Sequence, residues 1–111
     1  MEIQSRDVKD VKIVDLVGDL DTNTASQCET YLKKVIDDGA KKVLLNLEKL
    51  DFMSSAGLRV SLVTGKLLQS AGGSLRVCNL NETIQEIFEM SGFITILNVT
   101  KTEQEALDSF L

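Results

Sequence analysis

Hydrophobic and polar residues along the chain follow two patterns that replace each other in a regular order. Short apolar stretches at residues 3–5 and 11–17 flank a polar turn at residues 6–10, so the chain is predicted to open with an antiparallel hairpin. Residues 43–47 contain almost no polar positions, as in a central strand that helices cover on both faces of a parallel sheet. Two further strands are predicted at residues 75–78 and 93–99.

Helices are predicted between these strands, where apolar residues recur every three or four positions. The first covers residues 22–38, and the residues that begin it, Thr22, Asn23 and Thr24, are all possible N-caps. The second covers residues 56–71 and has a broad apolar face. Glycines follow both helices and mark their ends.

The remaining two helices are recognised by their capping patterns. Asn79 precedes Glu82 by three residues, in a relative of the capping box, and this helix ends at Gly92. Residues 102–105 form a full capping box, and apolar residues beyond it give the last helix a face to dock with. The order of elements predicts a single α/β domain over residues 1–111, a sandwich with a mixed, mostly parallel sheet, an opening antiparallel hairpin and about four helices.

Composition and charge exclude several classes of function. Hydrophobic residues make up 43% of the 111 residues and charged residues 26%, which is ordinary for a soluble globular domain. The net charge of -5 argues against nucleic acid as a partner. Because no apolar run approaches the roughly 18 residues that a membrane span needs, and no secretion signal is present, a cytoplasmic protein without membrane insertion is predicted.

The side chains that usually carry catalysis or hold metals are scarce. Cys28 and Cys78 lie far apart and are predicted to be buried free thiols. The chain has no histidine, so it lacks the usual general base and the commonest neutral metal ligand. The carboxylates of Asp19, Asp21 and Asp51 lack the spacing of a calcium loop and are interpreted as solvated. The sequence therefore predicts no enzyme, no cofactor and no metal site.

A pair of serines stands where an apolar strand end leads into the second predicted helix. Backbone N–H groups at a helix start lack intrahelical partners and carry a partial positive charge, so a hydroxyl there is well placed to bear a phosphate. Ser54 and Ser55 can also be explained as simple N-caps, although a helix needs only one. Gly57 suits either close helix packing or a ligand contact.

Three strand-to-helix segments are expected to meet at one edge of the sheet. They are residues 18–23, 51–55 and 79–81, each of which follows a predicted strand. Because the carboxyl ends of parallel strands lie together, these segments should form one acidic and hydroxyl-rich surface.

Several segments together resemble a STAS domain of the anti-sigma factor antagonist family, along nearly the whole chain. The resemblance is carried by residues 18–21 (GDLD), 43–47, 50–58 (LDFMSSAGL) and 91–107. It implies a STAS-like sandwich and a bacterial regulator that binds an anti-sigma factor, which is a serine kinase of the histidine-kinase-like ATPase fold. Binding would free a sigma factor or another client. The kinase would switch the antagonist off by phosphorylation, and a metal-dependent serine phosphatase would restore it.

In the family pattern, the phosphoacceptor falls on Ser55, two positions before Gly57. Ser54 stands where many relatives carry aspartate and is a rival acceptor, Ala56 stands where they often carry Ser or Thr, and Arg59 replaces a small residue. The predicted partner-binding residues are Asp21, Thr22, Asn23, Asp51, Met53, Ser54, Ala56, Gly57, Leu58 and Arg59. The alternative is a non-switching STAS adaptor, a subunit of a membrane transport or larger signalling complex.

Overall fold

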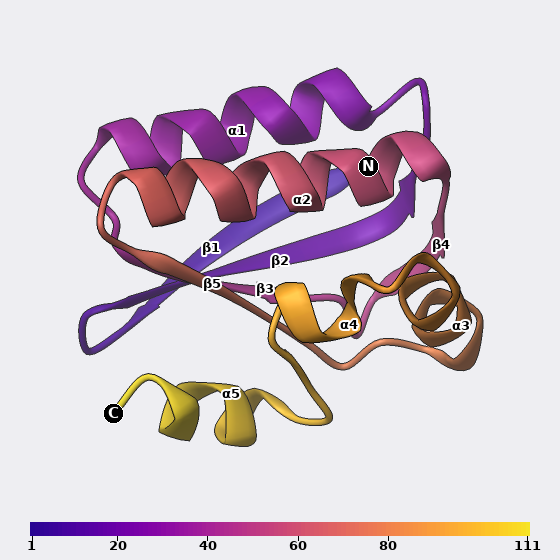
Figure 1. The fold of residues 1–111 in the computed structure, drawn as a ribbon. Coiled ribbons are helices and arrows are strands. Elements are labelled where there is room, and N and C mark those ends of the chain that lie inside the picture. Colours follow the sequence, from indigo (N-terminus) through magenta and orange to yellow (C-terminus); the bar gives the residue numbers. More distant parts are fainter.

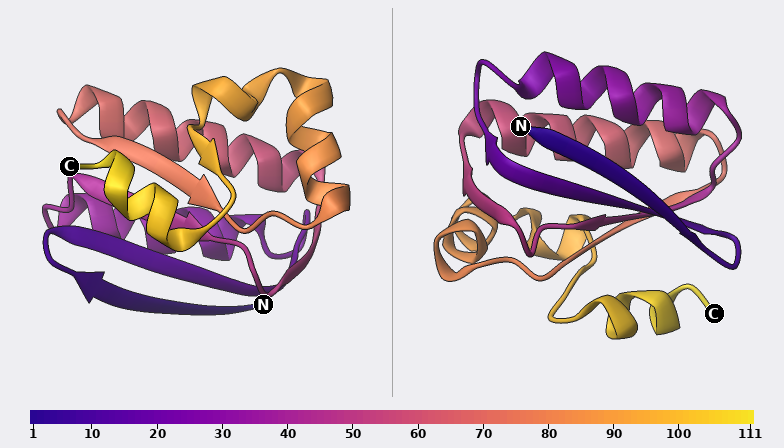
Figure 2. Two further views of the ribbon diagram at one scale, coloured as in Figure 1. Left: turned by 90° about the horizontal axis from the view of Figure 1, so that it is seen from below. Right: turned by 180° about the vertical axis from the view of Figure 1, so that it is seen from behind.

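A mixed sheet separates two layers of helices in the computed structural model, which describes the backbone of residues 1–111 and every side chain except those of Thr95 and Ile96. The strands are β1 (Glu2–Val8), β2 (Val11–Leu20), β3 (Lys42–Asn46), β4 (Leu50–Met53), β5 (Ser74–Cys78) and β6 (Val99–Thr100). The helices are α1 (Ala25–Asp37), α2 (Ser55–Ser70), α3 (Glu82–Ser91), α4 (Phe93–Ile96) and α5 (Glu103–Ser109). Helices α1 and α2 cover one face of the sheet (Figure 1), and α5 lies on the other (Figure 2).

The long strand β2 organises the sheet. The strand order is β1-β2-β3-β5-β6, in which only the β1–β2 pair is antiparallel. The first half of β2 pairs with β3 and its last residues pair with β4, both in parallel. The carboxyl ends of β2 and β4 therefore lie side by side, directly before the segments that enter α1 and α2.

The main apolar core lies between the sheet and helices α1, α2 and α3. Strands contribute fully buried side chains such as Val14, Leu45 and Val77, and the helices contribute Leu32 and Phe88. A smaller apolar cluster lies on the other face of the sheet, and its buried members are Val11, Ile13, Leu44, Cys78 and Ala106. Helix α5, which carries Ala106, covers this second cluster.

The predicted fold class is confirmed. The hairpin, the central position of β3 and all four predicted helices are present, and α4 adds one further turn. Cys28 and Cys78 are buried free thiols as predicted. Burial raises the pKa of each thiol to about 12, which keeps both in the unreactive protonated form at neutral pH.

The predicted strand at residues 93–99 is wrong. Residues Phe93–Ile96 form the one-turn helix α4, and only Val99–Thr100 are a strand. The N–H of Leu97 donates to the carbonyl oxygen of Phe93 at 2.9 Å, which closes the turn and buries Leu97 against the main core. A short apolar run is compatible with either a helix or a strand, because it is too short to show whether its apolar positions follow the helical or the strand period.

Two predicted ends also differ in the structure. Strand β1 continues through Arg6 to Val8, so the hairpin turn is confined to Lys9 and Asp10 instead of residues 6–10. The cap of α3 is Asn81 instead of Asn79, and its side-chain oxygen accepts from the N–H of Ile84 at 2.9 Å. Both misinterpreted residues make contacts with distant parts of the chain: Arg6 donates to Glu103, and the Asn79 amide donates to the side-chain oxygen of Asn46.

Helix α1 starts later than predicted and is not capped by a side chain of Thr22, Asn23 or Thr24. It begins at Ala25, and the side chain of its N-cap residue Thr24 makes no capping hydrogen bond. The Asp21 carboxylate instead accepts from the backbone N–H of Asn23 at 2.9 Å and of Thr24 at 3.2 Å. The acidic side chain before the predicted caps therefore stabilises this turn.

Candidate functional site

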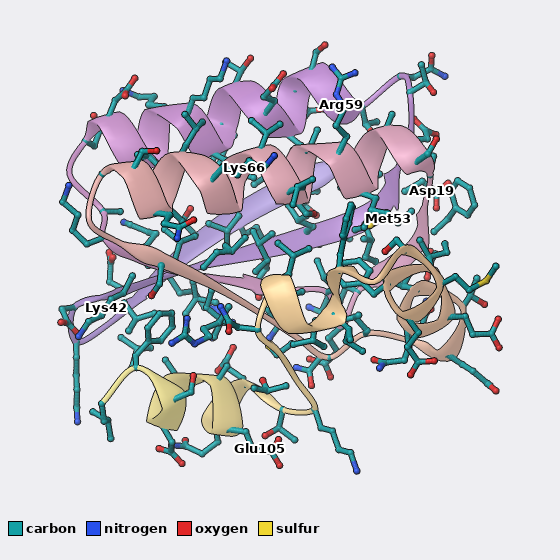
Figure 3. The ribbon with its side chains drawn as sticks, in the orientation of Figure 1. Asp19, Lys42, Met53, Arg59, Lys66 and Glu105 are labelled. Carbon is teal, nitrogen blue, oxygen red and sulfur yellow. The ribbon has the colours of Figure 1, made fainter. Side chains whose placement is uncertain are left out.

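The three predicted strand-to-helix segments meet at one end of the sheet. The N–H of Ser54 donates to the carbonyl oxygen of Leu20 at 2.9 Å, which joins the start of α2 to the end of β2. The Asn81 side-chain amide donates to the carbonyl oxygens of Leu50 and Asp51, at 3.1 and 3.2 Å. Figure 3 shows Asp19 and Met53 at this end of the molecule, where α2 begins. The topology therefore produces the common surface that the sequence predicts.

The two serines of this surface have different structural roles. Ser54 is the N-cap of α2, and its hydroxyl accepts from the N–H of Gly57 at 3.4 Å. Ser55 is the first residue of the helix and its side chain is exposed. The side chains that the structure describes make no hydrogen bond with the Ser55 hydroxyl. Capping therefore accounts for Ser54 and leaves the Ser55 hydroxyl accessible.

The start of α2 is electrostatically suited to an anion on Ser55. Four backbone N–H groups at a helix start lack intrahelical acceptors, and the helix dipole adds partial positive charge. No acidic side chain occupies the first turn of α2. Arg59 is exposed four residues beyond Ser55, so the two side chains lie on the same face of the helix, one turn apart.

The neighbouring segment before α1 is held rigid by its own side chains. The Thr24 hydroxyl accepts from the N–H of Asp21 at 2.9 Å and donates to the carbonyl oxygen of Asp19, also at 2.9 Å. These bonds leave Thr22 and Asn23 exposed at the tip. Asp51 and Asp19 are exposed, and Asp21 is half-buried, so the surface beside Ser55 is predominantly acidic.

Burial removes three predicted partner-binding residues from the accessible surface. Met53 has 0% of its surface exposed, Leu58 has 8%, and Gly57 is buried. These three residues are therefore largely withdrawn from the surface, and their contact with a partner stays a prediction. Their role is to fix α2 against the sheet. Ala56 is half-buried at the edge of the surface.

Gly57 permits a close approach between α2 and the end of β2. A Cβ atom at this position would lie 2.8 Å from the carbonyl oxygen of Leu20 and 2.7 Å from its Cγ atom. Both distances are shorter than van der Waals contact allows. The packing explanation for Gly57 thus has direct geometric support.

Phe52 belongs to the apolar strand end that leads into the second predicted helix and is not among the predicted partner-binding residues, yet it lies within the site. Its side chain is 45% exposed, although the strand residues on either side of the Asp51–Phe52 pair, Leu50 and Met53, are buried. No pattern in the sequence announces this, because strict alternation would place Phe52 on the same side as Leu50. The exposed aromatic ring is three residues before Ser55.

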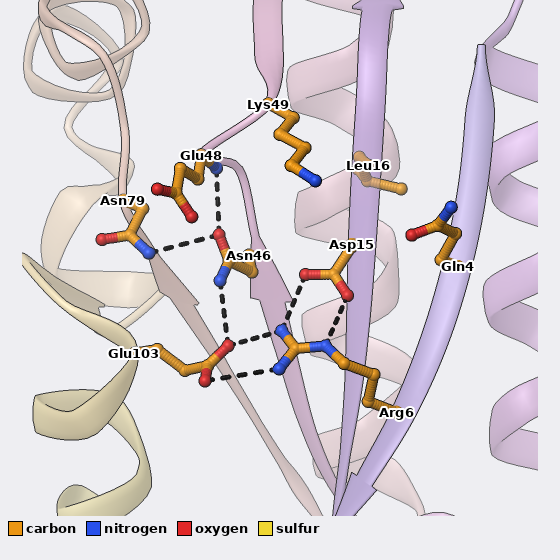
Figure 4. A pocket seen from close by; sticks show the side chains of 9 residues that line it. All are labelled: Gln4, Arg6, Asp15, Leu16, Asn46, Glu48, Lys49, Asn79 and Glu103. Carbon is orange, nitrogen blue, oxygen red and sulfur yellow. Dashed lines mark hydrogen bonds and ion pairs between the residues drawn. The ribbon is translucent and has the colours of Figure 1, made fainter.

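A second polar region lies beside α5, on the face of the sheet that α1 and α2 do not cover. It surrounds a cavity of about 370 Å³ and is shown in Figure 4; the residues that line it are Gln4, Arg6, Asp15, Leu16, Asn46, Glu48, Lys49, Asn79 and Glu103. The Arg6 guanidinium donates to Asp15 at 2.7 and 2.8 Å and to Glu103 at 2.5 Å. The Asn46 amide donates to the same Glu103 carboxylate at 2.9 Å. Because Arg6 and Asn46 are already paired, we interpret this cluster as an attachment for α5.

We expect the attachment of α5 to weaken in acid. The hydrogen bonds from Arg6, with a smaller one from Asn46, lower the pKa of Glu103 below its ordinary value of 4.5. A group whose pKa is lower in the folded state stabilises that state above the ordinary pKa, and its contribution is lost as the pH falls through the lowered value. Hydrogen-exchange protection of α5 amides should therefore decrease as the pH falls below the ordinary pKa of 4.5, while that of α2 persists.

The Glu103→Gln variant is the control for this pH dependence. It retains the shape of the side chain without the titration, so α5 protection should already be low at pH 7 and should vary little in acid. Equal protection of α5 in wild type and Glu103→Gln at pH 7 would contradict the proposed attachment.

Neither a metal-binding cluster nor a membrane-spanning helix is present among the described residues. No group of three or more histidine, cysteine, aspartate and glutamate side chains comes together there in a way that could hold a metal ion. None of the helices that the structure describes has the length and apolar character needed to cross a membrane.

Comparison with known proteins identifies the family. A family model described as the STAS domain matches residues 2–106. BtrV of Bordetella bronchiseptica, which is provisionally named as an anti-sigma factor antagonist, is 36% identical over 110 residues, covering 99% of this chain and 95% of that protein. The anti-sigma F factor antagonist of Paenibacillus polymyxa is 32% identical over 108 residues, covering 96% and 92%. The chain therefore belongs to the STAS domain family.

Solved structures agree with this assignment. The anti-sigma factor antagonist SpoIIAA in its unphosphorylated form superposes with a TM-score of 0.76 at 26% identity, covering 98% of this chain and 97% of that one. SpoIIAA of Bacillus in its phosphorylated form gives a TM-score of 0.77 at 26% identity, covering 99% and 100%. The names of these relatives describe regulators and not enzymes, as the sequence predicts.

Proposed function

We propose that this protein is an anti-sigma factor antagonist that acts in the cytoplasm and is switched by phosphorylation of Ser55. In its unmodified form it binds an anti-sigma factor, a serine kinase of the histidine-kinase-like ATPase fold, through the surface around Ser55, and thereby releases a sigma factor or another client. The observation that carries the proposal is the accessible Ser55 hydroxyl at the first position of α2, beside a second serine that supplies the cap. The names of the relatives support the antagonist role.

The proposed docking surface extends from α2 to the tip of the segment before α1. Thr22 and Asn23 are exposed there, and Asp21 holds the tip in place through its carboxylate. The start of α2 contributes Ser54, Ala56 and Arg59, and Asp51 lies within the preceding strand β4. A partner that covers this surface would desolvate the Ser55 hydroxyl.

Phosphorylation changes this surface without requiring the fold to change. A phosphate adds about -1.5 to -2 charges and three acceptor oxygens. At the helix start it is stabilised by roughly 0.3 to 1 kcal/mol through amide and dipole contacts. A partner fitted to a neutral hydroxyl would have to accommodate and desolvate a dianion close to Asp21 and Asp51. Such juxtaposed like charges can cost several kcal/mol.

The proposal is tested by phosphorylation with purified components. Incubation with ATP and the anti-sigma factor kinase should add a single phosphate to the wild-type chain, detected by mass spectrometry, and Ser55→Ala should receive none. A metal-dependent serine phosphatase should remove the phosphate again.

Ser54→Ala serves as the matched control. It loses the N-cap, which costs about 1 kcal/mol of stability, but it should still accept one phosphate. A phosphate on Ser54, or persistent labelling of Ser55→Ala, would contradict the assignment of the acceptor. Tight kinase binding without any phosphate transfer would instead favour the non-switching adaptor.

A further inference from the structure

Strands β2 and β4 contain an irregularity directly before the Ser55 site. Gly18 of β2 lies opposite Leu50 of β4, but the next residue of β2, Asp19, lies opposite Phe52. One residue of β2 therefore corresponds to two of β4, and Asp51 is the extra residue of a β-bulge. Bulges are rare between parallel strands, and they commonly redirect side chains near functional sites.

The bulge determines which side chains of β4 face solvent. Side chains alternate along a regular strand, so Phe52 would share the buried side of Leu50 and Met53 would face outward. The extra residue reverses this phase. Phe52 is 45% exposed, whereas Met53 is completely buried. The other phenylalanines are at least partly buried in the two apolar clusters, as the burial of Phe88, Phe93 and Phe110 shows.

Exposed acidic and hydroxyl groups surround the Phe52 side chain. Asp19 lies directly opposite on β2, about 4.8 Å away between strand axes, and is exposed. Asp51 is exposed beside it, and Ser55 follows three residues later. Aromatic residues, phenylalanine included, are enriched at protein interfaces, whose rim is polar.

We propose that Phe52 is the apolar anchor of the partner interface. Its ring inserts into an apolar pocket of the anti-sigma factor, and a basic side chain at the rim of that pocket faces Asp19. Complementarity of charge supports this rim, because the exposed groups next to the ring are carboxylates. The inference rests on the proposed function, since it names the chemistry of the partner at the same surface. The bulge then has a functional consequence: it exposes the anchor while Met53 secures the start of α2.

The test is isothermal titration calorimetry against each anti-sigma factor of histidine-kinase-like ATPase fold that the organism encodes, purified singly. Phe52→Ala should raise the Kd of the binding pair by at least about thirtyfold, which corresponds to the loss of an interface hot spot. Phe52→Leu, which retains an apolar side chain, should raise it less. Because Phe52 is half exposed, neither variant should lose the cooperative unfolding of wild type.

Leu67→Ala is the matched control. Leu67 is 38% exposed and lies on the same helix as Ser55, but twelve residues further along, about 18 Å away. Its truncation should change the Kd by less than about threefold, the range of a near-neutral surface position. Asp19→Asn should weaken the salt dependence of association while leaving the ring in place.

The outcomes separate this inference from the proposed function. If wild type binds one of the purified kinases and Phe52→Ala binds it equally well, the anchor is refuted while the antagonist function stands. If wild type binds none of them, both the proposed function and the anchor are refuted. Equal losses in Phe52→Ala and Leu67→Ala would show a general effect of truncating apolar residues and would also refute the anchor.

Discussion

Ser55→Asp is expected to raise the Kd for the purified anti-sigma factor by more than about a hundredfold, whereas Ser55→Ala should bind like wild type. A penalty of about 3 kcal/mol suffices for this change, because each 1.4 kcal/mol is tenfold. The penalty would arise from desolvating an added carboxylate in the proposed interface, next to Asp21 and Asp51. Calorimetric titration measures it directly.

The same substitution should leave the fold intact. A carboxylate at the first position of α2 interacts favourably with the helix dipole, and Arg59 lies one turn away on the same face. These contributions amount to roughly 0.3 to 1 kcal/mol, so Tm should be unchanged or slightly higher. The rise should not exceed about 8 °C. A large fall in Tm would mean that the loss of binding reflects unfolding.

Ser70→Asp provides the control at the other end of the helix. Ser70 is the exposed last residue of α2, where the dipole disfavours negative charge, so this variant should be slightly less stable than wild type. It should bind the partner normally. If Ser70→Asp weakened binding as much as Ser55→Asp, the effect would follow from net charge and not from the position of the hydroxyl.

Gly57→Ala is expected to lower the free energy of unfolding by about 1 to 3 kcal/mol, the usual range for an overpacked site. Its methyl group would meet the carbonyl oxygen of Leu20 at 2.8 Å, and a backbone atom cannot turn aside as a flexible side chain can. This loss should exceed the roughly 1 kcal/mol that alanine gains over glycine in a helix. Urea denaturation measures the difference.

Gly65→Ala is the matched substitution within the same helix. Its nearest atoms are the side-chain Cδ2 atoms of Leu97 at 3.4 Å and of Leu75 at 3.6 Å, which is ordinary contact distance. This variant should be as stable as wild type or more stable, by about 0.5 to 1 kcal/mol. Equal stability of the two alanine variants would show that α2 is not fixed against the end of β2.

The parts of the fold that the sequence predicts correctly have long or unmixed patterns. Strand β3 is a continuous apolar run, and α2 maintains one apolar face over four turns. The failures are local or depend on distant residues. Residues 93–99 are too short for periodicity to decide between helix and strand. Arg6 resembles a turn residue, but it lies in β1, where it pairs with Ile13 and its guanidinium donates to Glu103, 97 residues away in sequence.

The candidate site divides in the same way. Strand-to-helix order is sufficient to predict that the segments before α1, α2 and α3 meet, and the serine pair predicts an exposed hydroxyl at a helix start. Sequence alone does not reveal the bulge at Asp51, because one extra residue in a four-residue strand leaves no periodic signal. This is why the sequence does not predict the exposure of the Phe52 side chain.

The most direct test of the account compares the two states of one protein. The wild-type chain, before and after stoichiometric phosphorylation of Ser55, should be titrated into the same purified anti-sigma factor, with Tm measured for both forms. The account predicts a Kd more than about a hundredfold higher for the phosphorylated form, with a Tm no lower than that of the unmodified form. Equal Kd values for the two forms would contradict it.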